Sequence, residues 1–183
     1  MPTTYAHYKF GKEVLSALPR PLQNSIEAHR ELFDIGLHGP DILFYYNALK
    51  KDPVNEQGHT LHEQFADEFF HHAVEVIEKA KDPAAARAYI YGFICHFALD
   101  SECHPYVEKI MQVGRVSHNE IEMELDRMML TEDYHDPLRY LTAKHIQPKM
   151  EYAEVIAPFF KDVTAEQIYK ALRQWGNTIH CMT

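Results

Sequence analysis

The chain contains two histidine–carboxylate pairs whose spacing suits the binding of a metal ion. His96 precedes Asp100 by four residues, and His118 precedes Glu122 by the same interval. On an α-helix, residues four apart lie one turn apart and about 40° apart around the axis, so each pair presents two ligands on one face. His104 follows Asp100 by another four residues. These five side chains are therefore candidates for one metal-binding region.

The candidate residues lie on the apolar faces of their predicted helices. Phe93 shares a stripe with His96, and Ile121 and Leu125 share one with Glu122. Each stripe has the three-to-four-residue spacing of a helix face that packs inward. The pattern therefore predicts buried carboxylates as well as buried imidazoles.

An inward carboxylate needs a counter-charge, because burying it unpaired costs several kcal/mol. Basic residues are scarce between residues 83 and 126, where the chain offers only Arg87, Lys109 and Arg115. A bound cation is the simplest partner, and histidine with carboxylate suits a catalytic zinc, or iron or manganese. The alternative is a polar network between helices, in which His96 bonds Glu122.

Composition limits the possible functions. The chain has 183 residues, which fits one domain over residues 1–183, with 46% apolar residues and a formal charge of −9. This acidity argues against a stable nucleic-acid complex, although bound metal would offset part of it. No apolar run approaches the roughly 20 residues of a membrane span, and the first residues lack the pattern of a signal peptide. Three cysteines without CxxC spacing fit a reducing compartment, so we expect a cytoplasmic protein.

Apolar periodicity predicts helices throughout, so the expected fold class is all-α. Proline and glycine mark the breaks, and His104-Pro105 is expected to interrupt one helix. Asp82 and Ser117 are expected N-caps, the latter in a capping box with Glu120. The predicted helices cover residues 4–18, 23–37, 60–81, 84–102 and 118–130, a segment beginning near 135 and leading to 150, and residues 164–175. Loops are expected at 36–42 and 50–59.

The chain has 13 histidines, and several are expected to be ordinary surface residues. That group consists of His29, His71, His72, His135, His145 and His180. Cys103 lies near the candidate histidines, but a thiolate ligand is not expected there. His38, in the loop GLHGPDI, is a weaker candidate for the mouth of the site.

An ordered series of further residues extends the pattern toward the N-terminus. The series consists of His7 in TYAHYKFG, Asp41 in GLHGPDI, His62 in GHTLHEQ, His96-x3-Asp100, His104 and His118-x3-Glu122. This series resembles the zinc-dependent phospholipase C family, which shares its fold and trinuclear zinc site with the S1/P1 nucleases. The resemblance implies a single-domain multi-helix bundle of the phospholipase C/P1 nuclease type. His7, Asp41 and His62 enter through this resemblance alone.

The resemblance implies two or three zinc ions with distinct ligand sets. One ion would take Asp41, His62, His96 and Asp100. Asp100 would bridge to a second ion, which also takes His7 and the amine and carbonyl of the mature N-terminal residue. A third ion would take His104, His118 and Glu122. Secreted members expose a tryptophan amine, whereas this chain begins Met1-Pro2, so our hypothesis gives the amine position to Pro2 after removal of Met1.

Three of these assignments have plain alternatives. His7 can be a surface residue of the first helix, and Asp41 can simply turn or cap the chain. GHTLH offers both His59 and His62 as ligands, and we favour His62. The spacing from Asp100 to His104 is slightly shorter than in secreted relatives. This difference weakens the assignment of His104 as a ligand of the third ion.

The implied activity is hydrolysis of a phosphodiester by a zinc-activated water. Asp41 would orient the water or act as base, as proposed for the family. Aromatic residues near Asp41 would either line the site or pack in the core, and the same choice applies to Phe69 and Phe70; those near Asp41 are Phe44, Tyr45 and Tyr46. Substrates include a phospholipid headgroup or a soluble phosphate ester. The alternatives are a di-iron helical bundle that binds oxygen or does redox chemistry, and a metal-stabilised binding domain without catalysis.

Overall fold

The computed structural model describes the backbone of residues 4–180 and the side chains of residues 4–176. Its elements are α1 (Thr4–Ala17), α2 (Arg20–Glu27), α3 (Arg30–Gly36), the 3₁₀-helix η1 (Gly39–Tyr45), α4 (Pro53–Glu63), α5 (Ala66–Lys79), α6 (Pro83–Gly114), α7 (His118–Glu132), α8 (Met150–Ile156), the 3₁₀-helix η2 (Ala157–Phe159) and α9 (Ala165–His180). No strand occurs within residues 4–180. The all-α prediction is confirmed.

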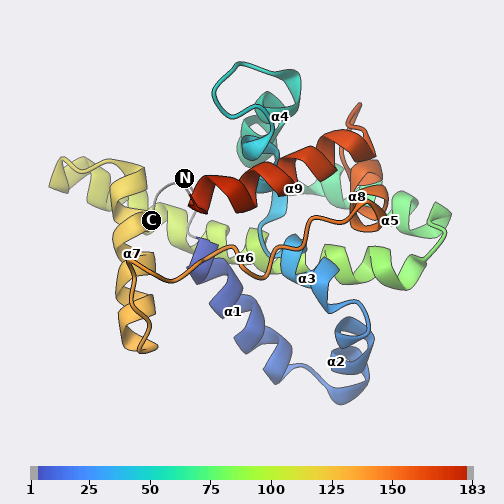
Figure 1. Cartoon of the computed structure of the whole chain (residues 1–183), viewed down its shortest axis with the longest axis horizontal. Coiled ribbons are helices and arrows are strands. Elements are labelled where there is room, and N and C mark those ends of the chain that lie inside the picture. The colour runs from blue at the N-terminus through green and yellow to red at the C-terminus, as the bar shows by residue number, and fades with distance from the viewer. Residues whose placement is uncertain (1–3, 181–183) are drawn as a thin grey trace.

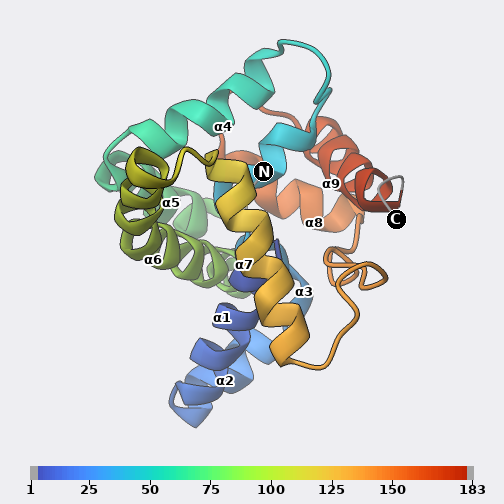
Figure 2. The same ribbon diagram turned by 90° about the vertical axis from the view of Figure 1, so that its left-hand side faces the viewer.

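Helix α6 is the organising element of the fold. It has 32 residues, which corresponds to about 48 Å. The side chain of Asp82 accepts hydrogen bonds from the N–H groups of Ala84 and Ala85, both at 3.0 Å, and Pro83 follows at the first helical position. Figure 1 shows α6 crossing the molecule, with α1 and α2 on one side and α4 and α9 on the other. Figure 2 shows α7 crossing in front of this bundle.

Two glycines allow α3 to pack unusually close to α6. A Cβ at Gly36 would lie 2.1 Å from the carbonyl oxygen of Tyr89, and a Cβ at Gly92 would lie 2.2 Å from that of Phe33. Both neighbours are backbone atoms, so neither can move aside easily. This close approach brings the segment after α3, which carries His38 and Asp41, against the middle of α6.

The prediction that His104-Pro105 interrupts the helix is wrong, because α6 continues through Pro105 to Gly114. A proline inside a helix removes one hydrogen bond and costs about 3 kcal/mol. Here Ser101, whose carbonyl loses that partner, is exposed and can be solvated. The following turn buries Val107, although most of the residues after it in α6 are exposed. The uninterrupted helix keeps His104 one turn after Asp100 on the same helix.

Two other predicted helices are each divided. The helix predicted at 23–37 is α2 and α3, separated at His29, and α2 begins earlier because Pro21 is accepted in its first turn. The helix predicted at 60–81 is α4 and α5, separated at residues 64–65. The prediction of a loop at 50–59 is wrong after Asp52, because Asp52 caps α4 in a capping box that includes Asn55. The polar composition of this stretch had favoured a loop.

The C-terminal part differs from the prediction in where its helices lie. The segment expected to begin a helix near residue 135 forms turns, and the helix begins only at Met150, two residues after Pro148. Ala143 and Ile146 in this segment are nevertheless buried in the main core. Helix α9 extends to His180, beyond the predicted end at Trp175, and Thr164 caps it together with Gln167.

The core surrounds the middle of α6. Its largest fully buried side chains are Trp175, Tyr89, Phe33 and Phe159. The ring of Trp175 stacks on Tyr45 with centroids 4.4 Å apart, which ties α9 to η1. Within the described part of the chain, no helix combines the length and apolar character needed to cross a membrane.

Candidate metal centre

The structure gathers the predicted histidines and carboxylates into three clusters. We call them the Asp41 cluster (Asp41, His62 and His96), the His7 cluster (His7, His96 and Asp100) and the Glu122 cluster (His104, His118 and Glu122). In each, one nitrogen or oxygen atom per residue lies within 4.8 Å of the others. All eight predicted site residues belong to a cluster, and His96 belongs to two. They come from α1, η1, α4, α6 and α7.

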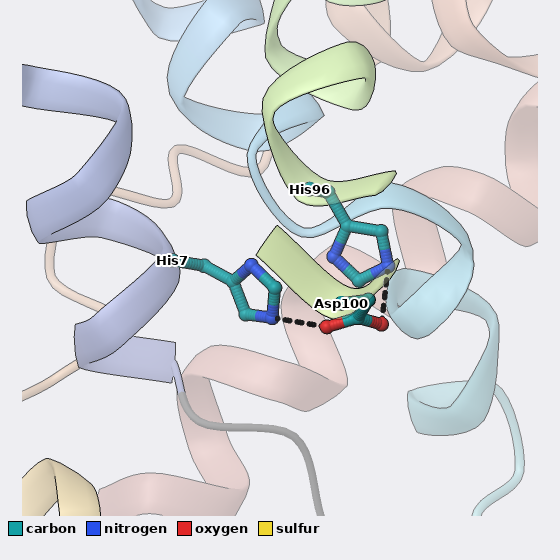
Figure 3. Close-up of side chains that lie close together, drawn as sticks. All are labelled: His7, His96 and Asp100. Carbon is teal, nitrogen blue, oxygen red and sulfur yellow. Dashed lines mark ion pairs between the residues drawn. The ribbon is translucent and has the colours of Figure 1, made fainter. Parts of the chain in front are cut away.

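Asp100 lies at the centre of the arrangement. Its Oδ1 atom is 3.1 Å from Nε2 of His7, and its Oδ2 atom is 3.2 Å from Nε2 of His96 (Figure 3). Oδ2 also lies 3.8 Å from Nε2 of His62 and 3.9 Å from Nε2 of His104. Burial alone would raise the pKa of Asp100, but the facing imidazoles hold this pKa well below its ordinary value. The carboxylate of Asp100 therefore stays ionised, and its two oxygens face histidines on opposite sides.

Asp41 is a buried carboxylate whose closest partner is an imidazole. It is 1% exposed, and neither oxygen has a partner among the described residues. Its closest ionic contact is between Oδ1 and Nε2 of His62, at 3.0 Å, while Oδ2 lies 4.0 Å from Nδ1 of His96. Burying a carboxylate costs several kcal/mol unless a cation lies beside it. At Asp41 that cation is either a protonated His62 or a bound metal ion.

The imidazoles differ in their electrostatic environments. Burial, together with neighbouring His7, lowers the pKa of His96 to about 4, so its ring is neutral at pH 7 and has a lone pair to offer. Burial also lowers the pKa of His62, but the carboxylate of Asp41 outweighs this effect and raises the pKa to about 9. Nδ1 of His7 and Nδ1 of His96 are both buried without a hydrogen-bond partner among the described residues.

The Glu122 cluster joins α6 to the start of α7. Ser117 and Glu120 cap α7 reciprocally, as predicted, and His118 is its first residue. Nε2 of His118 lies 2.7 Å from Oε1 of Glu122, whereas Nε2 of His104 lies 4.0 Å from the same oxygen. This cluster is more open than the other two, since both histidines are partly exposed. Although the spacing from Asp100 to His104 is short, His104 still lies close to His118 and Glu122.

Asp126 positions α1 and was missed by the sequence reasoning. Its two carboxylate oxygens accept hydrogen bonds from the N–H groups of Tyr5 and Ala6, each at 2.9 Å. These groups belong to the first turn of α1, where backbone donors lack helical partners. His7 follows directly, so Asp126 fixes the helix end that carries this histidine. The available signal was its spacing, four residues after Glu122 on the same helix face.

The open choice between His59 and His62 has a geometric answer. His62 lies beside Asp41, whereas His59 belongs to none of the clusters. Phe44 packs against both rings, with centroids 4.5 Å from His59 and 5.4 Å from His62. Tyr45, by contrast, is buried against Trp175 and serves the core. Of the aromatic residues after Asp41, Phe44 therefore lines the site and Tyr45 packs in the core.

Two cavities open onto the clusters and share His62, Asp100 and His104. One has a volume of about 270 Å³ and an aromatic wall that includes Phe65, Phe69, Phe93 and Phe97. The other is a cleft of about 890 Å³ whose polar lining includes Lys50, Lys51, Asn55, His59 and Asn119. A substrate with one apolar and one polar part can thus reach the same carboxylate from both sides.

Two histidines lie in places that the sequence did not indicate. His38, considered for the mouth of the site, is 1% exposed and contacts His145. His145, expected on the surface, is partly buried because the chain around it packs onto the core through Ala143 and Ile146. The proposed amine ligand, Pro2, lies outside the described residues.

Comparison with known proteins supports the resemblance inferred from the ordered residues. The model of the family described as zinc-dependent phospholipase C matches residues 6–177, which is nearly the whole chain and includes all eight candidate residues. Comparison with curated proteins and with solved structures gave no match. Because the match extends over the helices that build the three clusters, the chain belongs to the zinc-dependent phospholipase C family and is a zinc-dependent phosphoesterase.

Proposed function

We propose that the protein hydrolyses a phosphodiester with two or three zinc ions held by the three clusters. Asp41, His62, His96 and Asp100 would hold one ion, and His7 would hold a second ion that shares Asp100. The Glu122 cluster would hold the third. The observation that carries this proposal is the buried carboxylate of Asp41, which faces His62 and His96 and accepts no hydrogen bond among the described residues.

The contact distances fit tetrahedral zinc. Two ligands about 2.0–2.1 Å from one such ion lie roughly 3.3 Å apart. The contacts of Asp41 with His62, Asp100 with His7 and Asp100 with His96 are 3.0, 3.1 and 3.2 Å. The first ion's ligand set also has longer contacts, 4.0 Å between Asp41 and His96 and 3.8 Å between His62 and Asp100, and the Glu122 cluster spans 2.7 and 4.0 Å. Because both histidines of the Glu122 cluster are partly exposed, we expect the third ion to be the most weakly held.

When bound, zinc would acidify a water molecule and offset the charge on the phosphoryl group. Asp41 is the residue that we assign to orient this water and receive its proton. Oδ2 is its free atom for that purpose, since Oδ1 faces His62 at 3.0 Å whereas Oδ2 has its nearest ionic partner, His96, at 4.0 Å. General acid–base catalysis of this kind contributes about 10²–10⁴-fold.

The two cavities support an orientation for the substrate. The aromatic cavity of about 270 Å³ would take an apolar leaving alcohol, since Phe65, Phe69, Phe93 and Phe97 line one of its walls. The polar cleft of about 890 Å³ would take the headgroup side of the phosphodiester. A phospholipid meets both requirements, and a soluble diester with an aromatic leaving group meets them in part.

Removal of metal tests this proposal directly. Dialysis against a chelator is expected to lower hydrolysis of bis-p-nitrophenyl phosphate at least about 100-fold, because zinc supplies several kcal/mol of transition-state stabilisation. Added Zn²⁺ should restore the rate, whereas Mg²⁺, which prefers oxygen ligands, should not. A phosphocholine lipid measured in parallel tests the headgroup assignment. Full activity after chelation would contradict the proposal.

A further inference from the structure

His38 and His145 form a pair of histidines, one buried and one partly buried, that is not needed to hold any ion. Nε2 of His38 lies 2.7 Å from Nε2 of His145, across 107 residues of sequence. A hydrogen bond between two imidazoles requires one donor and one acceptor, so the accepting ring must be neutral. Burial lowers the pKa of His38 well below its ordinary value and that of His145 to about 3, which keeps both rings neutral.

His145 is held in place by contacts with α1 and with His38. Its ring stacks on Tyr8 of α1, with centroids 4.0 Å apart and planes 10° apart, and on the His38 ring at 5.0 Å. Ala143 and Ile146 anchor the same segment in the core. The imidazole of His145 therefore has little freedom to move and fixes the position of the His38 ring.

His38 in turn connects directly to residues of two clusters. Its carbonyl oxygen accepts a hydrogen bond from the N–H of Asp41 at 3.0 Å, in the first turn of η1. Its ring packs edge-on to that of His7, with centroids 6.3 Å apart. Gly39 follows with a positive φ of 48°, and a Cβ there would lie 2.2 Å from the His96 ring. A displacement of His38 therefore moves the turn that carries Asp41.

We propose that His145 is a positioning residue that acts through His38 to hold Asp41 at the zinc-binding distance from His62. The inference rests on the proposed role of Asp41 as a zinc ligand. Without the bond from His145, the ring of His38 would keep a buried polar nitrogen unpaired, which favours a shift of the whole turn. Groups that orient metal ligands in this way change metal affinity about 10–100-fold.

The test measures zinc affinity by competition with a chelator, without any substrate. His145→Phe keeps a ring to stack on Tyr8 but removes the hydrogen bond, and it is expected to weaken the binding of one zinc about tenfold. His145→Gln retains a donor and an acceptor and should recover most of that affinity. His72→Phe is the matched control, because His72 also bonds across elements, to the carbonyl of Pro158 at 2.9 Å, away from the clusters.

A double-mutant cycle separates positioning from a general loss of stability. In an Asp41→Asn background, His145→Phe should cause no further loss of zinc affinity, since its effect passes through Asp41. A lower melting temperature with unchanged zinc affinity would overturn the inference, and so would a full tenfold loss in that background. If His145→Phe does not fold, His145→Met makes the same test. Unchanged zinc binding in Asp41→Asn itself would instead refute the ligand assignment.

Discussion

Asp100→Asn is expected to remove more than one zinc ion from each chain. The two oxygens of Asp100 face different histidines, His7 at 3.1 Å and His96 at 3.2 Å, and the carboxylate lies between two clusters. An amide keeps the shape but replaces one anionic oxygen by a donor, which cannot bind a cation. The measurement is elemental analysis of the variant after gel filtration, compared with the native chain.

Glu102→Gln provides the matched control for this experiment. Glu102 is a carboxylate on the same helix, two residues further on, but it is exposed and belongs to no cluster. It should retain the native zinc content. Loss of only one ion from Asp100→Asn would contradict the bridging role, and loss of none would exclude Asp100 as a ligand.

Asp41→Asn is expected to lower the rate of phosphodiester hydrolysis about 10²–10⁴-fold even at saturating zinc. The carboxylate is assigned two roles, as a ligand beside His62 and as the group that accepts the proton of the water. Excess zinc can compensate for weaker binding but cannot restore a base. The comparison of kcat at increasing zinc concentrations therefore separates the two roles.

Asp67→Asn is a suitable control for that comparison. Asp67 is an exposed carboxylate in the first turn of α5, close in sequence to the aromatic cavity but outside every cluster. Its activity should stay within about threefold of the native value, as for a surface substitution. Recovery of the native kcat by Asp41→Asn at high zinc would show that Asp41 is a ligand and not the base.

The two histidine–carboxylate pairs could be predicted from the sequence because helix geometry is local. Four-residue spacing on an apolar stripe is enough to place His96 with Asp100, and His118 with Glu122. The approach of these pairs to each other is not local, and neither is the position of His7, Asp41 or His62. Those three residues lie on separate elements with no common spacing, so only the family resemblance suggested them. Their role as ligands stays a prediction.

Helix boundaries were harder to predict where tertiary contacts outweigh local preference. Proline at position 105 normally ends a helix, but α6 continues past it to Gly114 and buries Val107. Asp52 was hidden in a polar stretch although it caps α4. The partners of His145 and Asp126 lie more than 100 residues away, so no sequence window contains them. The single domain and the cytoplasmic location stay predictions.

The most direct test of the metal centre is elemental analysis of protein purified without added metal. Three clusters built from imidazoles and carboxylates should yield two or three zinc ions per chain, with the ion at the Glu122 cluster lost first on dilution. Iron in place of zinc, with visible absorbance, would indicate the di-iron alternative. A folded protein with no metal at all would contradict the account.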